Sequence, residues 1–260
     1  MFKKVNIIQF HPNQKRETIF PNPPSQSYIS LFQPSQFMQY SALLIPLLWY
    51  VCIFLGALGL YLGAWVAPSD FQQGENYRIL FIHVPSAWMS LLVYFFLTLT
   101  SGAFFLNKHP ILMHGSRILC AIGALFTCLT LITGSLWGKP MWGTLWVWDA
   151  RLTSVLILLF IYIGAMLLYE WVPDVAPVFV FIGLINIPII KFSVNWWNTL
   201  HQPSSITQFG TEIHISMLVP MNVFFVEFLL FVLVLFLLEL RREIQKKTID
   251  SLVQSNNSTL

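Results

Sequence analysis

The chain has 260 residues, of which 56% are hydrophobic and only 10% are charged, and its mean hydropathy is +0.68. One soluble core cannot bury this much apolar surface, so the composition excludes an ordinary globular protein and indicates a chain embedded in lipid. The formal net charge of +3 is not accompanied by a soluble basic segment interleaved with aromatic residues, which excludes nucleic acid as a partner.

Residues 1–40 are polar and proline-rich, so we expect a loosely ordered N-terminal tail rather than a cleaved signal peptide. Beyond this tail, apolar stretches long enough to cross about 30 Å of hydrocarbon occur six times. They cover residues 41–66, 79–106, 117–137, 152–171, 175–193 and 217–240. The sequence therefore predicts an all-α integral membrane protein, with six transmembrane helices within 41–240 and a charged, polar C-terminal tail at 241–260.

An even number of spans places both termini on one side of the membrane, and lysine and arginine indicate which side that is. Four of the 14 basic residues lie on the side away from the termini: Arg78, Lys139, Arg151 and Lys191. The others lie on the terminal side, in the two tails and around Lys108. We therefore expect the termini to face the cytoplasm or matrix, and the connection between the third and fourth spans to face the opposite compartment.

That connection holds four of the 10 tryptophans: Trp137, Trp142, Trp146 and Trp148. Indoles offer wide, flat apolar faces, and the glycines between them allow a close approach of the backbone. Asp149 and Arg151 add charge at the rim. We interpret this polar break as a platform for a large planar amphiphile.

A histidine lies at each of two further junctions on the same side. His83 follows Arg78 by five residues, about 7–8 Å along a helix, where a neutral imidazole is available as a ligand. His201 ends an aromatic run after the fifth span. Each alone is typical of a helix-end or interfacial histidine. Only His214, at the mouth of the sixth span, competes with them.

Together with the tryptophan platform, the two histidines match the needs of a planar tetrapyrrole. Such a ligand requires an apolar surface for the macrocycle, axial nitrogens for the iron and cationic groups for the propionates. Arg78 and Arg151 are the candidate cations. We expect Asp149 to orient Arg151 or a backbone donor, or to contact a partner. Lys191 is expected to extend towards the interface.

These motifs resemble the cytochrome c maturation protein C family, also called haem exporter protein C, within the tryptophan-rich haem-handling membrane proteins. The resemblance runs through residues 72–74, 83–85, 137–144, 146–154 and 193–202. It implies a six-span protein that holds haem b at its outer face, with His83 and His201 as the axial ligands of the iron.

The resemblance also implies partners in c-type cytochrome biogenesis. These are a membrane-anchored haem chaperone that receives the haem, a small one-span accessory subunit, and the ABC transporter subunits of the same system. Residues 191–220 look closer to mitochondrially encoded members, which favours the mitochondrial inner membrane with matrix-facing termini. A bacterial inner membrane with cytoplasmic termini is the alternative.

Two other functional classes stay open. A transmembrane haem conduit would use the six spans as a path, but no inverted repeat or run of intramembrane polar residues marks one. A haem-lyase-like role would attach haem to the chaperone. Because the sequence offers no nucleophile or base for that step, the contribution of this chain would be to position the haem.

Overall fold

The computed structural model describes residues 34–197, 201, 206–207, 210–211 and 213–257. Most of the predicted N-terminal tail therefore lies outside the described residues. The chain divides into two units, Met1–Ala42 and Leu43–Leu260. The described part of the first unit is the beginning of helix α1, and the site discussed below belongs entirely to the second unit.

Within the described residues, six helical segments are long and apolar enough to cross a membrane, which confirms the predicted fold class. The helices are α1 (Pro34–Tyr61), α2 (Leu80–Asn107), α3 (Pro110–Trp142), α4 (Ala150–Trp171), α5 (Ala176–Gly183), α6 (Asn186–Trp196) and α7 (Ile215–Asn257). A π-helical turn η2 (Leu62–Val66) and a 3-10 turn η3 (Glu75–Ile79) precede α2. Between α6 and α7, strands β1 (Ile206–Thr207) and β2 (Gly210–Thr211) pair antiparallel.

Several helices extend further than their apolar runs. Helix α1 begins at Pro34, and α7 continues to Asn257 through part of the predicted polar tail. The tryptophan-rich connection is correspondingly shorter than expected, because α3 continues to Trp142. Helix α3 is capped by Gly143, which has a φ of 76° and donates its N–H to the Lys139 carbonyl. A helix propagates until such a cap, not merely until its first polar residue.

The fifth predicted span is two helices rather than one. Helices α5 and α6 are separated at Leu184 and Ile185. Pro188 lacks the N–H that would bond to the Leu184 carbonyl, which favours a break here. The Asn186 side chain donates to the Ser154 carbonyl of α4 at 2.8 Å. This bond anchors the interrupted span to its neighbour.

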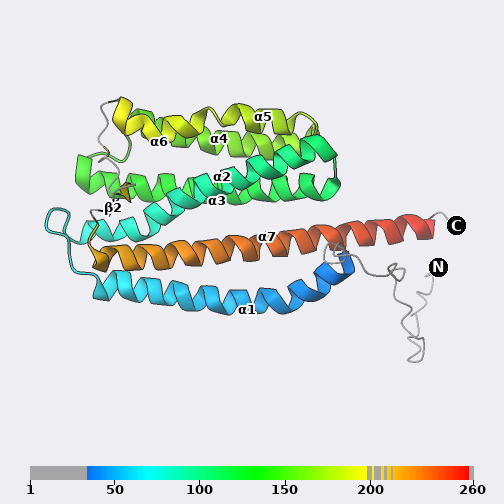
Figure 1. Ribbon diagram of the computed structural model, residues 1–260, viewed down its shortest axis with the longest axis horizontal. Coiled ribbons are helices and arrows are strands. Elements are labelled where there is room, and N and C mark those ends of the chain that lie inside the picture. Colours follow the sequence, from blue (N-terminus) through cyan, green and yellow to red (C-terminus); the bar gives the residue numbers. More distant parts are fainter. Residues whose placement is uncertain (1–33, 198–200, 202–205, 208–209, 212, 258–260) are drawn as a thin grey trace, which may run out of the picture. The chain divides into compact units, whose positions relative to one another are not determined.

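Within the second unit, α3 packs against α2, α4 and α7, and α4 packs against α5 and α6 (Figure 1). Helices in lipid gain little from the hydrophobic effect on association, so close packing and interhelical hydrogen bonds hold them together. Three buried tyrosine hydroxyls provide such bonds: Tyr162 to the Ser90 carbonyl, Tyr94 to the Val180 carbonyl, and Tyr169 to Ser101 Oγ, at 2.6, 2.7 and 2.7 Å.

The contact between α3 and α4 depends on Gly123. A Cβ added there would lie 2.0 Å from Cε1 of the buried Tyr162 ring. Gly123→Ala should therefore lower the free energy of unfolding by about 1–3 kcal/mol, because the ring cannot shift without straining its bond to Ser90. Thermal unfolding in detergent measures this as a lower Tm.

Gly115→Ala is the matched control on the same helix. Its Cβ would meet Phe236 at an ordinary contact distance of 3.6 Å. Alanine is the better helix former, so this variant should keep or slightly raise the Tm. An equal loss of stability in both variants would contradict the proposed role of the Gly123 contact.

Candidate functional site

A cavity of about 260 Å³ lies among α2, α3, α4, α6 and the segment that follows α6. Its aromatic and charged lining consists of two imidazoles, three indoles and two cations: His83, His201, Trp88, Trp142, Trp146, Arg151 and Lys191. The remaining wall is largely aliphatic, with Leu91, Val155 and Ile190 among its members. Residues that the sequence placed in three separate junctions therefore meet at one cavity.

His83 is positioned by the surface of α3. Its Nδ1 lies 3.0 Å from Thr133 Oγ1. Its ring contacts Trp137 edge-on, with 5.6 Å between the ring centroids. Gly134 leaves space for the imidazole, because an added Cβ would lie 2.9 Å from its Cε1. The orientation of this ring is thus set by one face of a single helix.

His201 is positioned by Asp149, which begins α4. Nδ1 of His201 lies 3.2 Å from Asp149 Oδ2. The other carboxylate oxygen accepts the Leu152 N–H at 2.7 Å and caps the helix. The Trp142 ring lies against the imidazole, with 5.0 Å between centroids. The Leu152 N–H is a backbone donor of the kind that the sequence analysis offered as one alternative for Asp149, whereas the contact with His201 was not expected.

The charge state of His201 reflects competing effects. Burial lowers the pKa of His201, the nearby Asp149 carboxylate opposes that shift, and Arg151 adds to it. The net effect is a pKa of His201 below its ordinary value, so the ring favours its neutral form. A neutral imidazole is the form that binds metal ions.

Two buried donors in the lining have no hydrogen-bond partner within the described part of the chain: Trp146 Nε1 and Arg151 Nε. An unpaired buried donor costs about 1–3 kcal/mol. An anionic oxygen on a ligand would satisfy both. Imidazoles, an apolar wall and unpaired donors together fit an amphiphilic tetrapyrrole with carboxylate groups.

Four of the predicted site residues lie outside the cavity lining: Trp137, Trp148, Asp149 and Arg78, the last of which is described below. Trp137 supports His83 from α3 and donates its Nε1 to Gln73 Oε1 at 2.9 Å. Trp148 is 76% exposed and packs edge-on against Trp146, with centroids 5.4 Å apart. Asp149 lies behind His201, as described above. These residues support or border the cavity.

Arg78 has a different environment from that of Arg151. It forms an ion pair with Glu75, 2.5 Å away, and donates to the carbonyls of Gly63 and Ala67. These bonds tie η3 to the end of η2. The alternative ligand His214 is likewise outside the lining, since it is exposed and bonds to Ser216 Oγ at 2.8 Å.

Lys191 and Thr133 were not recognised from the sequence as parts of the site. Lys191 lines the cavity because α6 packs against α4, whose first turn carries Arg151. Thr133 contacts His83 directly. A sequence signal for this face of α3 exists, because Thr130, Thr133 and Gly134 follow one another at helical spacing.

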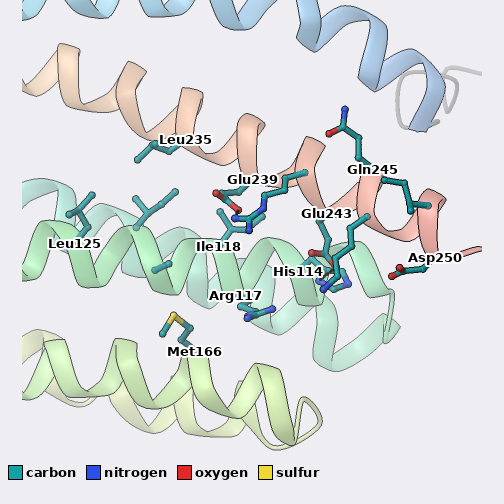
Figure 2. Close-up of a pocket in the computed structure, with 15 residues that line it drawn as sticks. His114, Arg117, Ile118, Leu125, Met166, Leu235, Glu239, Glu243, Gln245 and Asp250 are labelled. Atoms are coloured by element: carbon teal, nitrogen blue, oxygen red, sulfur yellow. Dashed lines mark hydrogen bonds and ion pairs between the residues drawn. The ribbon is translucent and has the colours of Figure 1, made fainter. Parts of the chain in front are cut away.

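A larger cavity of about 730 Å³ lies towards the other end of α3 (Figure 2). Its lining has one histidine, His114, and no tryptophan. Several of its charged side chains are already paired: His114 with Glu243, Arg117 with Glu170, and Arg242 with Glu239. Among the residues that the structure describes, the lining of this cavity holds no second imidazole of the kind that a bis-histidine tetrapyrrole site requires.

The family model described as heme exporter protein C matches residues 27–255. The chain belongs to this family. A cytochrome c biosynthesis ccmC-like mitochondrial protein of Marchantia polymorpha is 60% identical over 215 residues, covering 83% of this chain and 94% of the relative. This membership confirms the resemblance carried by the histidine and tryptophan motifs.

Two further relatives of this chain extend the comparison. A ccmC-like mitochondrial protein of Arabidopsis thaliana is 52% identical over 213 residues, with 82% of this chain and 83% of the relative covered. Heme exporter protein C of Bradyrhizobium diazoefficiens is 45% identical over 231 residues, with 86% and 88% covered. The similarity therefore includes both mitochondrial and bacterial proteins.

The opposing effects on His201 are testable by titration. In protein purified without bound ligand, the ¹⁵N shifts of its imidazole should report a midpoint below the ordinary value of about 6.5. Asp149→Asn should move the midpoint lower, because it removes the anion while keeping a residue able to cap α4. Since unfolding restores the ordinary pKa, His201 makes the fold less stable as the pH falls through this range.

Asp174→Asn is the control for a general effect of removing an acidic residue. Asp174 pairs with Lys108 at 2.7 Å, away from the cavity lining. The His201 midpoint should not change in this variant. A higher midpoint in Asp149→Asn would contradict the contact between Asp149 and His201.

Proposed function

We propose that this protein holds haem b between His83 and His201 and delivers it to a membrane-anchored haem chaperone for c-type cytochrome biogenesis. Its family membership and the names of its relatives support haem handling in cytochrome c maturation. The observation that carries the finer proposal is the convergence of two imidazoles, from α2 and from the segment after α6, on one cavity.

Both imidazoles ligate the iron through Nε2. Each Nδ1 faces an oxygen atom, that of Thr133 for His83 and that of Asp149 for His201. Partners of this kind fix the orientation of metal-binding histidines and raise their basicity. Trp142 and Trp146 provide flat apolar surface to the macrocycle.

Arg151, Lys191 and Trp146 Nε1 bind the propionates. Arg151 and Lys191 supply positive charge at the cavity, and the buried Trp146 and Arg151 donors gain acceptors. Charge-assisted bonds of this type are stronger than bonds between neutral groups. We assign the second propionate cation to Lys191 rather than to Arg78, because the hydrogen bonds of Arg78 hold η2 and η3 together.

The cavity faces the side of the membrane away from the termini. Lys108 and Arg117 lie at the opposite end of the bundle, where they pair with Asp174 and Glu170, and this arrangement agrees with the positive-inside rule. The positive-inside rule expects few basic residues on the cavity side, and two of the four found there, Arg151 and Lys191, are explained by their role in binding the propionates. The plant relatives are named as mitochondrial proteins, which together with the six apolar spans supports a multi-pass protein of the mitochondrial inner membrane. The charge bias of the sequence is the ground for placing the termini in the matrix.

Haem delivery requires contacts with other subunits. The exposed Trp148, next to Trp146, forms the outer edge of the platform, where the chaperone approaches. The one-span accessory subunit and the ABC transporter subunits complete the system. Attachment of haem to the chaperone uses the chemistry of the chaperone, while this chain positions the haem.

A platform is favoured over a transmembrane conduit. The α3 residues between the linings of the two cavities include Phe126 and Thr127, which are 2% and 0% exposed. Tyr162 packs nearby against Gly123 and is also fully buried. Dense packing of this kind separates the cavities along α3.

The purified protein should carry b-type haem with the optical spectrum of a six-coordinate, bis-imidazole iron. His83→Ala and His201→Ala should each block transfer of haem to the chaperone, because each removes one axial ligand. Protein levels in the membrane should stay near normal, since helix packing rather than iron holds the bundle together.

His214→Ala provides the matched control, because His214 lies in the neighbouring segment but outside the cavity lining. It should retain near-normal haem transfer. A thiolate-type or five-coordinate spectrum in the intact protein would count against the pair of ligands. So would loss of transfer in His214→Ala together with normal transfer in His201→Ala.

A further inference from the structure

The geometry assigns Thr133 a role as the positioning residue of His83: its hydroxyl accepts a hydrogen bond from Nδ1–H and holds the tautomer in which Nε2 carries the lone pair. The consequence for iron rests on the proposed function. The tautomer itself is a property of the haem-free protein. Thr133 thereby determines which nitrogen of His83 is able to act as a ligand.

The direction of this hydrogen bond follows from the other contacts of the hydroxyl. Thr133 Oγ1 lies 2.7 Å from the Leu129 carbonyl and 3.3 Å from the Thr130 carbonyl. A carbonyl oxygen only accepts, and a hydroxyl has one proton to donate. The proton of Thr133 is therefore directed into its own helix.

Towards His83 the same oxygen acts as an acceptor. The distance from His83 Nδ1 to Thr133 Oγ1 is 3.0 Å, within the normal range for a hydrogen bond. Nδ1 must then carry the proton. A neutral imidazole has only one N–H, so Nε2 carries the lone pair.

The surroundings of the ring leave this arrangement little freedom. Threonine in a helix readily bonds back to the carbonyl four residues earlier, so the hydroxyl is fixed by α3 itself. Gly134 admits the ring edge, and Trp137 contacts it one turn further along. Rotation of the imidazole is therefore restricted by three consecutive features of one helix face.

The tautomer is measurable in haem-free protein with ¹⁵N-labelled histidine, by solid-state NMR in lipid bilayers. The wild type should show His83 with Nδ1 protonated and Nε2 unprotonated. Thr133→Val keeps the shape of the side chain but removes the acceptor, so the population with Nε2 protonated should rise. Thr133→Ser should restore the wild-type pattern, because it returns the hydroxyl.

Thr127→Val is the matched control. Thr127 lies on the same helix and makes the same type of bond, to the Gly123 carbonyl at 2.7 Å, whereas the hydroxyl in contact with His83 is that of Thr133. Its substitution should leave the tautomer of His83 unchanged. A wild-type ring protonated at Nε2, or an unchanged tautomer in Thr133→Val, would overturn the inference. The wild-type measurement decides the matter even if Thr133→Val does not fold.

Haem binding supplies a second readout. Loss of a hydrogen-bond partner behind a metal-binding histidine lowers affinity by about 10–100-fold. Thr133→Val should therefore bind haem at least about tenfold more weakly, while Thr133→Ser and Thr127→Val stay near the wild type. Wild-type protein without bis-histidine haem would refute the proposed function, with the tautomer result unaffected. Normal haem affinity in Thr133→Val would refute the role of Thr133 and leave the proposed function standing.

Discussion

Close packing of aromatic rings onto the small residues of α3 is the interaction on which both the bundle and the cavity depend. Lipid tails are as apolar as the helices, so helix association in a bilayer relies on van der Waals contact and hydrogen bonds. Gly123 admits the Tyr162 ring, Gly134 admits His83, and Gly138 admits Trp142. The first two of these contacts each join two helices, α3 with α4 and α3 with α2. The second and third place an imidazole and an indole at the cavity.

The polar groups of the site also belong to the hydrogen bonding of the helices. Asp149 caps α4 with one carboxylate oxygen and contacts His201 with the other. Thr133 bonds to a carbonyl of α3 and contacts His83. Each imidazole is therefore oriented by a residue that a helix already fixes. Such preorganisation lowers the entropic cost of holding a large ligand in one position.

The basic residues near the site illustrate what the sequence was able to predict and what it was not. Charge bias and span count placed Arg78, Arg151 and Lys191 on one side of the membrane. Which of them reaches the cavity depends on how each helix is packed, and hydropathy contains no such information. Arg78 is engaged by η2 carbonyls, whereas Lys191 reaches the lining through the packing of α6 on α4.

The spans themselves were predictable because apolar length is a strong signal, while their ends were not. Helix α3 extends through Lys139 and Pro140 to a cap at Gly143, so part of the expected loop is helical. The break between α5 and α6 falls within one apolar stretch, where hydropathy alone gives no signal, although Pro188 is a local one. His83 and His201 were recognised through their motifs, but their partners Thr133 and Asp149 depend on contacts between distant segments.

The most direct test is an electron cryo-microscopy map of the haem-loaded protein in a lipid nanodisc. We expect density for one planar macrocycle in the cavity lined by Trp142 and Trp146, with His83 and His201 on opposite faces of the iron. Density for the macrocycle in the larger cavity beside His114, or an iron bound by His214, would contradict the assignment of the haem site.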